Sequence, residues 1–102
     1  MIQTVRLIAR ALFPGGVIHL ERTVELPFAP WAGCALAGVV ADQGARVVVC
    51  RSGYCVARGV WLAEVHPFGV DRDAVAARAR FGPGWQTAEE LEAACAAGEP
   101  PF

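Results

Sequence analysis

Apolar and polar positions alternate through much of the first 65 residues, which is typical of β-strands with one buried face. Residues 4–13 and 17–26 alternate on either side of Pro14-Gly15-Gly16, whose residue types favour a tight turn. The two stretches therefore predict an antiparallel hairpin with a single apolar face.

The charged residues of this hairpin indicate its register. If the two glycines of the tip form the turn, Arg10 lies opposite Glu21 and Arg6 opposite Glu25, so that opposite charges face each other. Arg22 then falls on the apolar face. An arginine there either extends past small neighbours to solvent, is rotated outward by a bulge, or is a buried cation that binds an anion or a carboxylate.

Residues 45–65 predict a second hairpin that turns at Ser52-Gly53, and residues 34–41 predict a strand before it. In this register Cys50 lies directly opposite Cys55, near the distance that a disulfide requires. Reduced thiols are favoured, because no secretion signal is evident.

Both faces of these later strands are apolar, and such strands are normally covered on both sides. Two short helices, each about 10 Å across, cover only one face of a five-stranded sheet about 24 Å wide. We therefore expect the second face to meet another subunit, to bind a small apolar ligand, or to close into a barrel. The residues expected at such an interface are Val47, Val49, Val56, Val60 and Leu62.

The last third of the chain changes to a helical pattern. Asp71 or Asp73 is the expected N-cap of a short helix that ends at Phe81. Thr87-Ala88-Glu89-Glu90 is a capping box, and it predicts a second helix that ends before Gly98. Strands followed by helices predict a two-layer α+β domain, with a mostly antiparallel sheet of about five strands and two short C-terminal helices.

Composition and charge narrow the class of protein. The chain has 102 residues, 55% of them hydrophobic, and a formal net charge of −1. One domain spanning residues 1–102 is expected at this length, and the weak charge argues against nucleic acid as a partner. The longest stretch without formal charge, residues 26–41, is shorter than the roughly 20 residues that span a membrane. Because the chain begins in a strand pattern rather than a signal segment, we expect a cytoplasmic protein.

Catalytic and metal sites have little support in the sequence. The spacing of Cys50 and Cys55 is not that of a zinc knuckle, so neither a metal nor a cofactor is expected, and no catalytic residue is assigned. His66 lies at the expected end of a strand, where active residues and ordinary loop histidines both occur. Trp31 and Trp85 lie beside proline or glycine, in loops where large rings line pockets and interfaces. The candidate ligand-binding residues are Trp31, Trp85, His66 and Arg22.

Two short segments carry a resemblance to a known group. Leu26-Pro27-Phe28-Ala29-Pro30-Trp31-Ala32-Gly33 and Gly84-Trp85, about a fifth of the chain, resemble segments of small orphan proteins on integron gene cassettes of environmental bacteria. The resemblance implies a compact and often oligomeric α+β domain without an assigned activity. It implies no catalytic residue.

Two hypotheses of function arise from these observations. The first is a non-enzymatic, homo-oligomeric binding or accessory module, a homodimer or larger, whose apolar sheet face is covered by subunits or by a small apolar ligand. The alternative is a small ligand-binding protein or enzyme with a pocket between sheet and helices. Mass in solution and thermal shift with metabolites distinguish the two.

Overall fold

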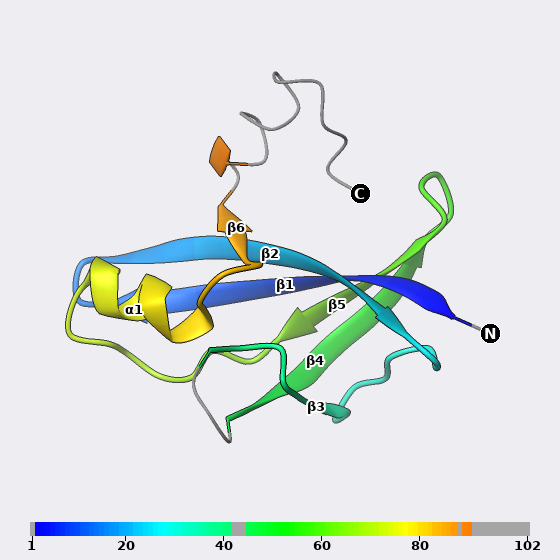
Figure 1. Ribbon diagram of the computed structural model, residues 1–102, viewed down its shortest axis with the longest axis horizontal. Helices are drawn as coiled ribbons and strands as arrows, with labels where there is room; N and C mark the ends of the chain where they lie inside the picture. The colour runs from blue at the N-terminus through cyan, green and yellow to red at the C-terminus, as the bar shows by residue number, and fades with distance from the viewer. Residues whose placement is uncertain (1, 42–44, 88, 91–102) are drawn as a thin grey trace.

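The computed structural model describes residues 2–41, 45–87 and 89–90, and these form one mixed six-stranded sheet with one helix (Figure 1). The strands are β1 (Gln3–Phe13), β2 (Gly16–Leu26), β3 (Ala35–Ala37), β4 (Arg46–Cys55), β5 (Val60–Val65) and β6 (Gln86–Thr87). The helix is α1 (Ala74–Phe81). Their order across the sheet is β3-β4-β5-β1-β2-β6, and β1 runs parallel to β5 while the other neighbours are antiparallel.

This arrangement is an α+β fold that differs from the predicted one in two respects. The sheet has six strands rather than about five, and beside the expected antiparallel pairs it contains one parallel pair, β1 with β5. The predicted second helix, residues 87–98, lies mostly outside the described residues. Its capping contact is present, because the Thr87 hydroxyl accepts the backbone N–H of Glu90 at 3.2 Å.

The first hairpin forms as predicted, with its register moved by two residues. The loop is Pro14-Gly15 rather than Gly15-Gly16, and Gly15 adopts a φ of 94° that favours glycine. Arg10 therefore lies opposite His19, and the Arg6 guanidinium pairs with Glu21. A shift of two leaves each side chain on its predicted face, so the apolar face is preserved.

The second hairpin turns later than predicted. β4 continues through Ser52-Gly53 to Cys55, and the chain turns over residues 56–59, where Gly59 has a φ of 70° and donates its N–H to the carbonyl of Cys55 at 2.8 Å. Cys50 and Cys55 therefore lie on the same strand rather than opposite each other, and both thiols are free. In this longer hairpin Tyr54 lies across from Trp61, and their ring centroids are 5.2 Å apart. Such an aromatic pair stabilises this pairing over the shorter hairpin.

The predicted strand over residues 34–41 is regular only at Ala35–Ala37. Gly38 has a φ of 81°, which takes the chain out of the extended conformation, and residues 38–41 then fold over the sheet. Ala41 donates its N–H to the carbonyl of Phe81 at 3.0 Å, so this segment meets the end of α1.

The core lies between one face of the sheet and a cover formed by α1, residues 38–41 and the turn that carries Trp85. From the cover, Ala77 and Phe81 of α1 and Trp85 are buried, and Leu36 of the edge strand β3 belongs to the same core. Phe81 and Trp85 meet edge to face with centroids 5.0 Å apart. The buried residues contributed by β1, β2, β4 and β5 are Val5, Leu7, Ala9, Ala11, Leu20, Val47, Val49, Val60, Ala63 and Val65.

The opposite face of the sheet carries charged pairs beside apolar side chains such as Ile8 and Leu62, so the prediction that both faces of the later strands are apolar is correct only in part. Glu64 of β5 pairs with Arg51 at 2.7 Å and lies 3.8 Å from Arg10, and the Arg6–Glu21 pair lies on the same face. The five residues predicted to share an interface do not share a face: Val47 and Val49 are in the core, whereas Val56 is 85% exposed in the β4–β5 turn.

Candidate functional site

Two of the four candidate ligand-binding residues meet on a single backbone carbonyl. Arg22 donates from Nη1 to the carbonyl oxygen of Val39 at 2.7 Å, and Trp85 donates from Nε1 to the same oxygen at 2.7 Å. The Arg22 guanidinium also packs against Gly84, where an added side-chain carbon would lie 3.3 Å from Arg22 Cζ. Arg22 is therefore on the apolar face, as predicted, and its charged group binds the protein's own backbone.

A second arginine holds the turn that carries Trp85. Arg78 of α1 donates from Nη2 to the Trp85 carbonyl at 2.6 Å and from Nη1 to the Gly82 carbonyl at 3.2 Å. Trp85 itself is 1% exposed. The contacts of Arg22, Arg78 and Trp85 thus attach residues 38–41 and the end of α1 to β2 of the sheet, which is a structural role.

The other two candidates lie elsewhere. His66 is exposed, and its backbone N–H donates to the carbonyl of Val48 at 2.9 Å, which extends the β4–β5 pairing by one residue. Trp31 is 57% exposed in the loop after β2. The structure therefore brings Arg22 and Trp85 together and leaves Trp31 and His66 apart from them.

The loop that carries Trp31 is irregular, as its prolines predict, and it presents two aromatic rings. Phe28 and Trp31 pack with centroids 5.4 Å apart, and Phe28 is 36% exposed. Cys34 N–H donates to the Trp31 carbonyl at 3.0 Å, and Gly33 N–H donates to the Val49 carbonyl at 2.7 Å. The rings are thus held on a loop with a fixed backbone.

A second aromatic pair, Tyr54 and Trp61, lies at the end of β4 and β5 near this loop. The Ser52 hydroxyl donates to the carbonyl of Pro30 at 2.8 Å, which fixes the loop against β4 two residues before Tyr54. Tyr54 is 50% exposed and packs on Trp61, whose Nε1 donates to Gln3 at 3.2 Å. In Figure 1 this loop and the β4–β5 turn lie at the end of the sheet away from α1. We call Phe28, Trp31, Tyr54 and Trp61 the aromatic surface.

The sequence predicts one part of this surface and misses the rest. Trp31 is a candidate because it lies beside Pro30, whereas Phe28 and Tyr54 are not among the candidate residues. The available signal for Phe28 is the pair of flanking prolines, which keep its segment out of a strand and therefore at the surface.

The described residues contain no group of three His, Cys, Asp or Glu side chains that could hold a metal ion. The Cys50 thiol donates to the Glu64 carbonyl at 3.2 Å rather than to a histidine. Glu21, which shares a strand with His19, pairs with Arg6.

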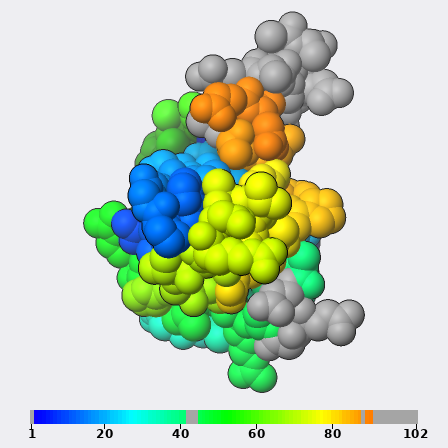
Figure 2. Space-filling view, turned by 90° about the vertical axis from the view of Figure 1, so that its left-hand side faces the viewer, coloured from blue at the N-terminus to red at the C-terminus, as the bar shows by residue number. Residues whose placement is uncertain are grey.

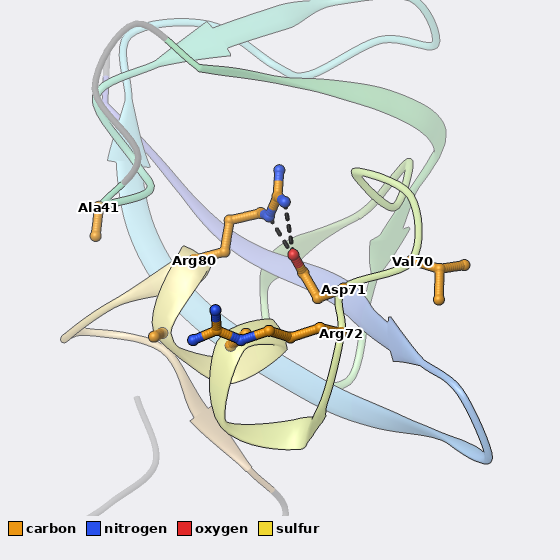
Figure 3. A pocket seen from close by; sticks show the side chains of 7 residues that line it. Ala41, Val70, Asp71, Arg72 and Arg80 are labelled. Carbon is orange, nitrogen blue, oxygen red and sulfur yellow. Dashed lines mark hydrogen bonds and ion pairs between the residues drawn. The ribbon is translucent and has the colours of Figure 1, made fainter.

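A depression of about 630 Å³ lies beside α1, on a flank of the helix that does not face the sheet (Figure 3). Its apolar walls come from Ala41, Val70, Ala76 and Ala79. None of the four candidate ligand-binding residues lines it. Figure 2 looks onto the end of the molecule that carries α1, with the β1–β2 turn beside the helix.

Comparison of the chain with protein-family models, with curated proteins and with solved structures gives no match. The resemblance to integron cassette proteins therefore stays a prediction. The features that bear on function are the aromatic surface, the Arg22–Trp85 junction and the depression beside α1.

Proposed function

We propose that the protein is a non-enzymatic, cytoplasmic binding module that forms a homodimer or larger homo-oligomer through the aromatic surface. The observation that carries the proposal is the exposure of Trp31 and Tyr54, at 57% and 50%, on backbone that hydrogen bonds hold in place. Large rings on rigid backbone bury much apolar area on binding and lose little conformational entropy. This differs from the interface expected from the sequence, because Val47 and Val49 are already buried within the chain.

A second copy of the chain is the partner that this surface fits best. In a two-fold symmetric interface the same patch faces itself, so any charge in the centre is brought near its own copy. The four residues of the aromatic surface carry no formal charge, and neither do Pro30 and Ser52 between them. Aromatic rings also pair favourably with each other in offset or edge-to-face contacts.

Exposed valines elsewhere on the chain can be compared with the exposed rings of the aromatic surface. Val75 on α1 is 78% exposed and Val70 is 66% exposed, but both are aliphatic and lie apart from the aromatic surface. An isolated exposed aliphatic residue is ordinary in a monomer and needs no partner.

Sedimentation velocity of substituted proteins tests the proposal. We expect Trp31→Ser to shift the self-association equilibrium toward monomer by about tenfold or more, because truncation of a central interface tryptophan costs roughly 2 kcal/mol or more. The control Val75→Ser removes exposed apolar area outside the surface and should leave association unchanged. If the two variants and the wild type sediment alike, the aromatic surface is not the interface.

The described residues include no helix that is both long and apolar enough to cross a membrane.

A further inference from the structure

We propose that the depression beside α1 binds a small apolar carboxylate, a site separate from the aromatic surface and beyond the proposed self-association. Its volume of about 630 Å³ lies within the range of small-molecule sites, about 300–1,000 Å³. Ala41, Ala76 and Ala79 line it with methyl groups, and Val70 adds an apolar side chain that is 66% exposed. An apolar ligand would remove this surface from water.

The walls of the depression are held in place before any ligand binds. Asp71 N–H donates to the carbonyl of Leu12 at 2.8 Å, and Val70 forms a β-bridge with Leu12, so this wall is attached to β1. The other wall is α1, whose N-terminus is capped by Asp73 through a bond from Ala76 N–H of 2.8 Å. A preformed site loses less conformational entropy on binding.

A neutral ion pair forms part of the lining. Arg80 donates to both carboxylate oxygens of Asp71, from Nη2 at 2.6 Å and from Nε at 3.2 Å, and the guanidinium lies 5.7 Å from the centroid of the Phe68 ring. Figure 3 shows the Arg80 side chain reaching to Asp71. Because Arg80 neutralises the charge of Asp71, this carboxylate is not available to bind a cationic ligand. The other charged residue that lines the depression is Arg72.

Arg72 is the group that selects a carboxylate. Among the described residues it pairs with Asp73 only, through Nε at 3.6 Å, so its two terminal amino groups have no hydrogen-bond partner in that part of the chain. Figure 3 shows its side chain lying along α1. A guanidinium binds a carboxylate through two parallel N–H bonds. The head of the ligand would therefore pair with Arg72 while its body lies against Ala76 and Ala79.

Titration of the ¹⁵N-labelled full chain with phenylacetate, followed by NMR, tests this inference. We expect shift changes centred on residues 70–72 and 76–80. The neutral isostere phenylacetamide should bind about tenfold more weakly, because it offers no charged acceptor. The substitution Arg72→Gln should weaken phenylacetate binding by about the same factor. Its matched control, Arg58→Gln in the β4–β5 turn, should leave binding unchanged.

The outcomes separate this site from the aromatic surface. Trp31→Ser should leave phenylacetate binding intact, and Ala79→Leu, which fills the depression, should abolish it. Equal binding of phenylacetate and phenylacetamide, unchanged binding by Arg72→Gln, or the absence of shifts at residues 70–80 would each overturn the inference. Because Arg72 is 86% exposed, its substitution should preserve the fold and keep the test decisive.

Discussion

Arg22 and Trp85 donate hydrogen bonds to the same oxygen, the carbonyl of Val39, each at 2.7 Å. One donor comes from β2 and the other from the turn after α1, so a single peptide group joins the sheet to its cover. A carbonyl has two lone pairs and accepts both bonds, and the described residues contain no buried side-chain nitrogen or oxygen without a partner. This junction replaces the anion site that the position of Arg22 suggested.

Replacing Arg22 with methionine tests how much this junction contributes. The apolar stem is largely kept, while the bond to Val39 is lost and the contact with Gly84 is altered. We expect the free energy of unfolding to fall by about 1–3 kcal/mol, the range for a hydrogen bond from a charged donor in a partly buried site. Urea unfolding measures it. The control Arg46→Met, at an exposed position of β4, should change stability little. Equal stability of the two variants would show that the junction contributes nothing.

The close approach of Gly82 to Ala41 gives a second prediction. Gly82 has a φ of 81°, and a side-chain carbon there would overlap Ala41 Cβ. Gly69→Ala is the matched control, because Gly69 also has a positive φ, 112°, but has open space around it. Gly82→Ala should therefore destabilise the protein by about 1–3 kcal/mol more than Gly69→Ala does, from overpacking alone. Thermal or urea unfolding of the two variants measures the difference, and its absence would contradict the contact.

The Arg51–Glu64 pair predicts a pH dependence of stability. The hydrogen bond from Arg51 lowers the pKa of Glu64 below 4.5, desolvation acts in the opposite direction, and the charges of Arg51 and Arg10 lower it further. The ionised carboxylate therefore adds stability that is full above the unfolded-state pKa and is lost as the pH falls through the folded-state pKa. We expect part of the loss of stability below about pH 5 to disappear in Glu64→Gln.

The effect of Glu64→Gln should be small, since solvent screens an exposed arginine such as Arg51. Unfolding measured between pH 3 and pH 7 compares Glu64→Gln with the wild type. The control is Glu25→Gln, at an exposed position of β2. If Glu64→Gln and the wild type lose stability in parallel as the pH falls, the pair contributes nothing measurable.

The local features that sequence predicts well are those in which a few residues decide the structure. Asp73 caps α1, Phe81 ends it, and the β1–β2 hairpin keeps its apolar face despite a shift of two residues. The two prolines of the loop after β2 exclude a regular strand, and that segment is irregular. In each case residues close in sequence determine the outcome.

The sequence predictions are wrong where contacts between residues distant in sequence determine the structure. Ser52-Gly53 has the composition of a turn, but pairing of Tyr54 with Trp61 and of Arg51 with Glu64 extends β4 beyond it. The parallel pairing of β1 with β5 joins residues more than 50 positions apart and has no local signal. The partner of Arg22 likewise comes from the turn at Gly38, which places the Val39 carbonyl over the sheet. Tertiary contacts override local preference in all three.

The mass of the wild-type protein in solution tests the central claim most directly. Size-exclusion chromatography with light scattering, across a concentration series, measures it without any label or substitution. Self-association through the aromatic surface predicts a mass at least twice the 10.8 kDa of one chain at high concentration, which falls on dilution if the contact is weak. A mass of 10.8 kDa at every concentration would contradict the proposal, because Trp31 and Tyr54 would then be exposed on a monomer.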